Sequence, residues 1–147
     1  MKLTDALLGE HAVIYAIFDY AERAVPGLAT LGEVQTVARM MVATLGSHAR
    51  VEEQLLFPAL DTQLGPAGPL AVMRQEHEDI DEALEAAVGA DSREVAARSI
   101  RDAIRIARSH FSKEERVLFM LAHRSLSEQE LDRLGDQWSD LRQVALG

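Results

Sequence analysis

Hydrophobic residues recur every three or four positions along most of the chain, which places them on one face of a helix. No stretch shows the alternation of hydrophobic and polar residues that a strand requires. Most glycine and proline residues fall in short gaps between these periodic segments. The pattern predicts an all-α protein with long helices over about 4–25, 30–58, 69–88 and 93–121, and a short helix that begins at Ser127.

Local signals agree with these boundaries. Proline and glycine at 26–27 stop the first helix, and Pro58 is expected to disturb the second. The segment 65–69 is the clearest loop in the sequence. Ser127 with Glu130 three residues later forms a capping box, which predicts where the last helix begins.

Helices of about 20 to 30 residues with short connections pack as antiparallel neighbours. We therefore expect an antiparallel up-down-up-down four-helix bundle over residues 1–123, with residues 124–147 as a short C-terminal helical tail packed on the same domain. A chain of 147 residues, 48% of them hydrophobic, is long enough to bury one core.

Composition narrows the function. The 15 basic and 24 acidic residues give a net charge of −9, which argues against nucleic acid or an anionic membrane as partner. The absence of cysteine excludes disulfides, thiolate nucleophiles and iron–sulfur clusters, so any metal must be held by nitrogen and oxygen. The sequence shows neither a secretory signal nor an apolar run of about 20 residues, and we expect a cytoplasmic protein.

The second and fourth helices share a motif. Both read His-x-x-x-Glu-Glu-x-x-Leu-Phe, starting at His48 and at His110. The first and third helices echo each other through Glu-His pairs at 10–11 and 76–77. The first two helices therefore resemble the third and fourth, as in an internal repeat.

This repeat directs polar side chains inward. A histidine and a glutamate four residues apart share one helix face, and an isoleucine three residues after His11 and after His77 places these two histidines on an apolar stripe. Unpaired in a core, these groups would cost several kcal/mol each. A dinuclear metal centre resolves this conflict. Its predicted ligands are His11, His48, Glu52, His77, His110 and Glu114.

The ligand count indicates a reactive centre. If Glu52 and Glu114 each bridge two ions and two histidines bind each ion, an octahedral ion keeps two further positions. One suits a bridging oxide or hydroxide, and the other stays open for an external ligand. Ligand type alone fits iron, manganese, zinc and nickel equally well.

These residues resemble the haemerythrin family, in particular the haemerythrin-like domains named for their His-His-Glu signature (HHE cation-binding domains). The similarity covers about residues 4–123 and includes the Leu-Phe-Pro sequence at 56–58. It implies a four-helix bundle around two iron ions, a non-haem di-iron centre with an oxo or hydroxo bridge. It also implies a small diatomic or peroxide ligand: dioxygen, nitric oxide or hydrogen peroxide.

Two positions depart from the oxygen carriers of that family. Those proteins carry a second third-helix histidine, where this chain has Met73 or Asp81, and their fourth-helix carboxylate is an aspartate one residue beyond the position of Glu114. Asp81 and Tyr15 each lie one turn after a predicted ligand and are candidates for an additional ligand or a neighbour that orients one. A more open centre favours peroxide turnover over oxygen storage.

The surroundings of the ligands are predicted as well. Glu53 and Glu115 should lie about 100° around the helix from the ligand face. Glu10 and Glu76 either orient a histidine or belong to a solvated face. The phenylalanines that end the two motifs should pack as a hydrophobic wall beside the site.

Three functions stay open at this point. The preferred one is decomposition of peroxide by a catalase-like or peroxidase-like activity. The second is a sensor of oxygen, iron or redox state, or an iron-binding module without turnover, that signals to a protein partner. The third is a metal-free bundle whose histidines are hydrogen-bonded core residues. The sequence does not indicate whether the chain forms a homodimer.

Overall fold

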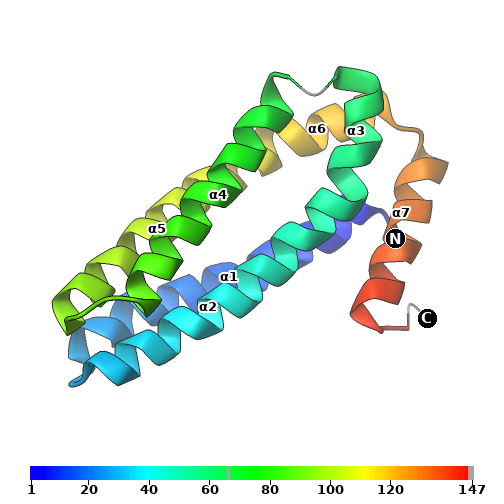
Figure 1. Cartoon of the computed structure of the whole chain (residues 1–147). Helices are drawn as coiled ribbons and strands as arrows, with labels where there is room; N and C mark the ends of the chain where they lie inside the picture. The colour runs from blue at the N-terminus through cyan, green and yellow to red at the C-terminus, as the bar shows by residue number, and fades with distance from the viewer. Residues whose placement is uncertain (66, 146–147) are drawn as a thin grey trace.

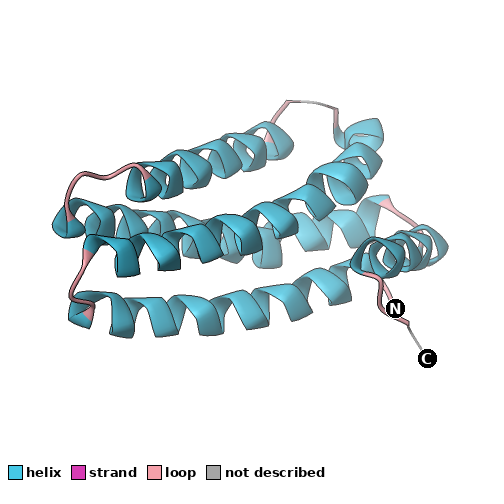
Figure 2. Cartoon of the chain, turned by 60° about the horizontal axis from the view of Figure 1, so that its bottom comes forward, coloured by secondary structure: helices cyan, strands magenta, loops and turns pink. Residues whose placement is uncertain are grey.

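The computed structural model describes residues 1–65 and 67–145, and this part of the chain contains helices and short connections but no strand (Figure 2). The predicted all-α class is confirmed. The α-helices are α1 (Leu3–Ala24), α2 (Leu31–Val51), α3 (Phe57–Leu64), α4 (Pro69–Val88), α5 (Arg93–Lys113), α6 (Phe119–Ser125) and α7 (Glu128–Arg142).

Four long helices, α1, α2, α4 and α5, lie side by side as a bundle (Figures 1 and 2). Side-chain caps fix where several of them begin. Thr30 caps α2 in a capping box with Glu33, and Ser92 accepts the Val95 backbone N–H at the start of α5. The predicted capping box of Ser127 at the start of α7 is also present. These caps satisfy backbone N–H groups that the first helical turn leaves without a partner.

Two π-helical segments interrupt the regular helices. They span Glu52–Leu56, between α2 and α3, and Glu114–Leu118, between α5 and α6. Each segment begins at a glutamate predicted as a bridging ligand, and π-turns inside α-helices are frequent at functional sites.

Pro58 does not end the second helix as its sequence suggested. The backbone continues through the π-segment and Pro58 lies in the first turn of α3, which runs on to Leu64. The Phe57 N–H bonds the Glu52 carbonyl five residues back, so the helix is already widened ahead of the proline ring. Met120 occupies the matching place in the other half, so the π-segments do not depend on proline.

The buried residues form two apolar clusters with a polar layer between them. On α1, Leu7 belongs to one cluster and Ile14 to the other, and His11 lies between. On α4, Met73 and Ile80 flank His77 in the same way. The bundle therefore encloses its inward histidines between two hydrophobic regions, which exclude water from both sides along its axis.

Helix α7 packs against the beginning of α1 at the end of the bundle where the chain starts (Figure 1). Leu131 and Leu134 are buried in the apolar cluster of that end. Gly135 approaches the start of the chain so closely that an added Cβ would lie 1.9 Å from the Met1 carbonyl oxygen. A side chain at this position would force the two elements apart.

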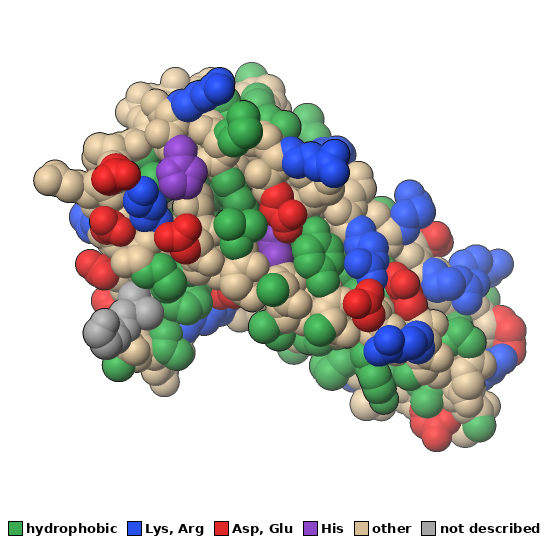
Figure 3. All heavy atoms as spheres, turned by 180° about the vertical axis from the view of Figure 1, so that it is seen from behind, with side chains coloured by type: hydrophobic (Ala, Val, Ile, Leu, Met, Phe, Trp, Pro, Cys, Tyr) green, Lys and Arg blue, Asp and Glu red, His purple; other side chains and the backbone are tan. Residues whose placement is uncertain are grey.

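The surface mixes side-chain types. On the face shown in Figure 3, acidic, basic and hydrophobic groups are interspersed. Within residues 1–65 and 67–145, no helix combines the length and the apolar character needed to span a membrane.

Candidate metal centre

The six side chains predicted as ligands converge in the polar layer of the bundle. None of them is more than 6% exposed. Helices α1, α2, α4 and α5 contribute one histidine each, and the first residue of each π-segment contributes a glutamate. The set is His11, His48, Glu52, His77, His110 and Glu114.

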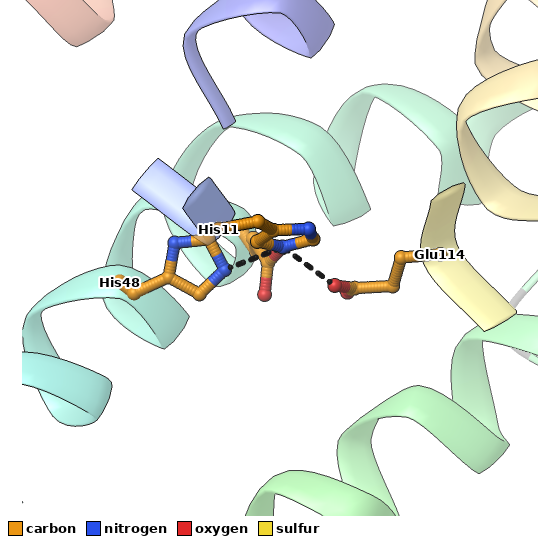
Figure 4. Close-up of side chains that lie close together, drawn as sticks. His11, His48 and Glu114 are labelled. Carbon is orange, nitrogen blue, oxygen red and sulfur yellow. Dashed lines mark hydrogen bonds and ion pairs between the residues drawn. The ribbon is translucent and has the colours of Figure 1, made fainter. Parts of the chain in front are cut away.

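These side chains form two groups that could each hold a metal ion. Cluster I consists of His11, His48, Glu52 and Glu114, and in cluster II His77 and His110 join the same two glutamates. Within each cluster the four donor atoms lie within 4.8 Å of one another. In cluster I, His11 Nε2 is 3.1 Å from His48 Nε2 and 3.2 Å from Glu114 Oε2 (Figure 4).

Each glutamate faces the two clusters with different oxygens. Glu52 Oε1 lies 3.2 Å from His48 Nε2, and Glu52 Oε2 lies 3.1 Å from His77 Nε2. Glu114 repeats the arrangement, because its Oε1 lies 3.1 Å from His110 Nε2 while its Oε2 faces cluster I. One oxygen for each cluster is the arrangement that a carboxylate needs to bridge two ions.

Four further glutamates hold the histidine rings from outside. Each ring places Nδ1 next to a carboxylate: His11 with Glu115 (2.8 Å), His48 with Glu10 (2.7 Å), His77 with Glu53 (2.8 Å) and His110 with Glu76 (3.0 Å). An ionised carboxylate only accepts, so Nδ1 carries the proton. When the ring is neutral, the Nε2 lone pair then points into the cluster, which is the tautomer that binds a metal.

These contacts refine the expectations for the outer glutamates. Glu10 and Glu76 orient histidines, the first of their two predicted alternatives. Glu53 and Glu115 lie beside the ligand face as expected, but each reaches a histidine of the opposite half of the chain. Glu53 and Glu115 occupy the same position in the two motifs, and this repetition was the feature of the sequence that indicated a role for them.

The donor set fits metal ions. The paired Nε2 atoms of each cluster are 3.1 Å apart, so two lone pairs would repel each other unless a proton or a cation lies between the rings. Glu52 Oε1 and both Glu114 carboxylate oxygens are buried, and no hydrogen-bond donor of residues 1–65 or 67–145 meets them. Such oxygens are costly to bury, and divalent cations would satisfy them.

Protons compete for the same atoms. Burial lowers the pKa of His48, but the Glu52 carboxylate and Glu10 outweigh burial and raise this pKa to about 10. Burial likewise opposes protonation of His110, and Glu114 raises its pKa to about 9. Metal binding must therefore displace protons from these imidazoles.

Tyr15 and Asp81, the two additional candidates, lie outside both clusters. The Tyr15 hydroxyl donates to Glu115 Oε1 at 3.2 Å. Burial and the Glu115 charge raise the pKa of Tyr15 to about 12, so it remains a donor at neutral pH. Asp81 is an exposed residue, and burial of part of its side chain raises the pKa of its carboxyl group.

Aromatic rings cover the histidines. Phe57 stacks on His77 with 5.5 Å between ring centroids, and Phe119 stacks on His11 at 5.7 Å. These contacts confirm the predicted hydrophobic wall. Phe111, which the sequence did not single out for the site, lies closest, stacked on His11 at 4.0 Å.

One side of the centre contains a small cavity of about 10 Å³, room for about one water molecule. Ala49 corresponds in the internal repeat to Phe111 of the other half, and Asp81 corresponds to Tyr15. The smaller side chains leave this side less filled. The lining residues are Leu45, His48, Ala49, His77, Ile80, Asp81, His110 and Phe111.

Sequence reasoning missed the contribution of α7. Trp138 and Arg142, four residues apart on this helix, both donate hydrogen bonds to Glu10. Burial raises the pKa of Glu10, but donors from His48, Arg142 and Trp138 outweigh burial and lower it to about 2. The only sequence signal was the spacing, which puts both α7 residues on one helix face.

Comparison with known proteins agrees with this geometry. A family model described as "Hemerythrin HHE cation binding domain" matches residues 2–122, which leaves α7 outside the match. Neither a curated protein nor a solved structure matches the chain significantly. The matched region contains all six converging side chains, and the resemblance seen in the sequence is confirmed. The chain belongs to the hemerythrin HHE cation binding domain family.

Proposed function

We propose that the two clusters hold two iron ions and that the protein binds or reacts with small oxidants: hydrogen peroxide, dioxygen or nitric oxide. The observation that carries this proposal is the pair of buried glutamates, each with one oxygen toward each cluster and three of the four oxygens without a donor. The family match, which names a cation binding domain, favours a metal.

Each side chain then has a stated role. Glu52 and Glu114 bridge, and the four histidines are terminal ligands whose rings the outer glutamates hold in place. Histidines from four helices reach one layer most simply in the up-down-up-down order expected from the sequence. When bound, a di-iron centre supplies open coordination positions and two redox-active ions to an oxidant.

The preferred activity is decomposition of hydrogen peroxide, in which two peroxide molecules give one dioxygen and two waters. This reaction balances without an external reductant. The cavity beside three of the histidines supports a small substrate, because it is the unfilled space next to the candidate ligands and has no room for a large molecule. Asp81 is the one carboxyl group of that lining outside the ligand set, and we propose that it takes and returns the peroxide proton.

A second candidate is a sensor or iron-binding module without turnover. The hydrogen bonds from α7 to Glu10 favour it, because they connect the centre to a peripheral helix. Steady-state measurement of peroxide and nitric oxide consumption separates the two. A sensor binds and changes conformation without rapid turnover.

The test is metal content per chain after iron reconstitution, together with the visible spectrum before and after peroxide. We expect two irons per chain and a ferric absorption that responds to peroxide. Glu52→Gln should lose both irons, because Glu52 belongs to both clusters. Glu78→Gln is the matched control, since Glu78 is exposed on α4 and should leave iron content unchanged.

Each other outcome rejects a specific part of the proposal. Stoichiometric zinc with a silent spectrum, even after iron reconstitution, rejects the redox function and keeps the site. Absence of bound metal returns the protein to a plain bundle with protonated core histidines. Full iron content in the Glu52→Gln variant rejects the bridging role.

A further inference from the structure

Two side chains of helix α7 donate hydrogen bonds to Glu10, one of the four outer glutamates. Trp138 Nε1 donates to Glu10 Oε1 at 2.6 Å, and Arg142 Nε donates to the same oxygen at 2.7 Å. Arg142 Nη2 donates to Glu10 Oε2 at 3.0 Å, and this oxygen also accepts the His48 Nδ1 proton at 2.7 Å. We call the set of Glu10, Trp138 and Arg142 the Glu10 clamp. It stands one side chain away from cluster I.

Arg142 also binds the helix that carries His48. Its Nη1 donates to Ser47 Oγ at 2.6 Å, and its Nη2 donates to the Ser47 carbonyl at 3.1 Å. The guanidinium of Arg142 on α7 therefore contacts both α1, at Glu10, and α2, at Ser47, the residue before His48. The planar fork of arginine suits such a multidentate contact, which the single ammonium of lysine cannot reproduce.

Among the described residues, no hydrogen bond connects α7 to the other three outer glutamates. Glu76 pairs with Lys113 of α5, and Glu115 accepts the Tyr15 hydroxyl. The Glu53 side chain is 48% exposed, and its hydrogen bond to a protein side chain among the described residues is the one from His77. Among the four inward histidines, His48 is thus the one whose outer glutamate is held by α7.

The clamp also dominates the docking of this half of α7. Leu131 and Leu134 anchor the beginning of the helix in the core. Around the clamp, by contrast, a hollow of about 550 Å³ separates α7 from α1 and α2. Its lining includes Ala6, Gly9, Val13, Thr44, Trp138 and Arg142. Polar contacts to Glu10 and Ser47 therefore hold this end where apolar packing is incomplete.

We propose that Arg142 and Trp138 are positioning residues for cluster I, and that metal in cluster I in turn tightens the docking of the C-terminal half of α7. This inference rests on the proposed metal binding. The clamp keeps the Glu10 carboxylate where it fixes the His48 ring, and a metal held by His48 fixes the same ring from the other side. Coupling of two binding events through a shared group is reciprocal.

The same contacts make the two clusters unequal. The Arg142 cation and the Trp138 N–H draw on the Glu10 oxygens, so Glu10 is a weaker acceptor for His48 than a free carboxylate would be. In cluster II, His77 bonds to Glu53, which lacks such donors, and the Glu76 carboxylate beside His110 has one cation, Lys113, in place of the arginine fork and the indole N–H. Two metal ions should therefore bind with different affinities, and changes in α7 should alter only the cluster I affinity.

Trp138 is the only tryptophan in the chain, so its fluorescence reports on the clamp directly. The test titrates full-length, chelator-treated protein with Zn²⁺, which is redox-silent, and records bound zinc, Trp138 emission and quenching by acrylamide. We expect emission to change and quenching to fall with only one of the two binding steps. The Glu52→Gln variant should show no emission response.

Variants test the other direction of the coupling. Arg142→Ala should weaken one of the two zinc sites by about tenfold, the scale typical of groups that orient metal ligands, and should leave the other site unchanged. Arg142→Lys should restore part of this loss, because it keeps the charge but not the fork. Arg133→Ala is the matched control, since it removes an equal charge from an exposed position of α7.

The outcomes distinguish this inference from the proposed function. Failure of the wild-type chain to bind zinc or iron rejects the metal centre itself. Binding of two ions with a Trp138 signal that stays constant, or with wild-type affinities in Arg142→Ala, rejects the coupling while the metal centre stands. Equal weakening of both sites would show a general structural effect and would also reject it.

Discussion

One position in each half of the chain makes the two sides of the candidate centre unequally filled. Phe111 stacks on His11, whereas the matching residue Ala49 borders the cavity beside His48 and His77. The six inward side chains are arranged almost symmetrically, but the packing around them is not symmetric. An oxidant is therefore expected to approach between α2, α4 and α5.

Filling this position should slow the reaction without removing the metal. In Ala49→Phe, the new ring would occupy the cavity as Phe111 occupies its counterpart. We expect two irons per chain and at least about tenfold slower binding of azide or consumption of peroxide, an increase of roughly 1.4 kcal/mol in the rate-limiting barrier. Stopped-flow absorbance of the reconstituted protein measures both rates.

Ala49→Ser, which keeps the side chain small, serves as the control and should react at the wild-type rate. Unchanged kinetics in Ala49→Phe with both irons bound would place the access route elsewhere.

The six inward residues could be predicted because their signal is local. A histidine and a glutamate four residues apart must share a helix face, and the repeat made chance an inadequate explanation. The hydrogen bond from Tyr15 to Glu115 could not be predicted, because it joins residues 100 positions apart on different helices. Periodicity indicates which face is buried, but not which side chain lies across it.

At the scale of elements, the π-segments were beyond the reach of the sequence. A segment of five residues with a wider turn changes the hydrophobic period too little to be seen, and Pro58 suggested a helix end at the same place. The helix boundaries marked by capping residues, as at Ser127, were predicted well, since a cap is a local hydrogen-bonding pattern. The contact of α7 with Glu10 spans 128 positions and had no such local signal.

Helix α7 approaches the start of the chain at Gly135, and a substitution there tests the docking of α7 without removing any polar side chain. In Gly135→Ala, the new Cβ would collide with the Met1 backbone. We expect a loss of about 1 to 3 kcal/mol in the free energy of unfolding, the usual cost of overpacking. Urea denaturation followed by circular dichroism measures it.

Gly46→Ala provides the comparison, because among the described residues a Cβ built there meets no atom within 4 Å beyond its chain neighbours and its own helix backbone, and the helix interior favours alanine. This variant should gain up to about 1 kcal/mol. Equal stability of the two variants would mean that the chain start moves aside at no cost.

The whole molecule carries an unusual core, in which ionised carboxylates and imidazoles occupy the layer between two apolar clusters. Without metal, protons on His48 and His110 offset part of the charge of the glutamates. The pKa of His48 in the folded protein, about 10, and that of His110, about 9, both lie above the value of 6.5 expected after unfolding. Folding of the metal-free protein therefore takes up protons near neutral pH.

This proton uptake fixes the sign of the pH dependence. A raised folded-state pKa contributes stability that is fully present below about pH 6.5 and is lost as the pH rises through about 9 to 10. We expect the urea midpoint of the metal-free protein to fall across this range. Metal-loaded protein should lose less, because metal has replaced the protons, and should be more stable at every pH in it.

Chemical denaturation of both forms at several pH values is the measurement. A metal-free protein whose stability rises over this interval would contradict the assignment of protonated, carboxylate-paired histidines.

Two of the four outer glutamates cross between the halves of the chain, since Glu53 serves His77 and Glu115 serves His11. A single half therefore lacks the carboxylate partner of one of its two histidines, and two copies facing each other would complete the set. The protein is thus built like a homodimer whose subunits have been joined into one polypeptide. A true homodimer must alter both sides of its centre together, whereas here each side can change alone. Phe111 could thus close one side of the centre while Ala49 left the other open.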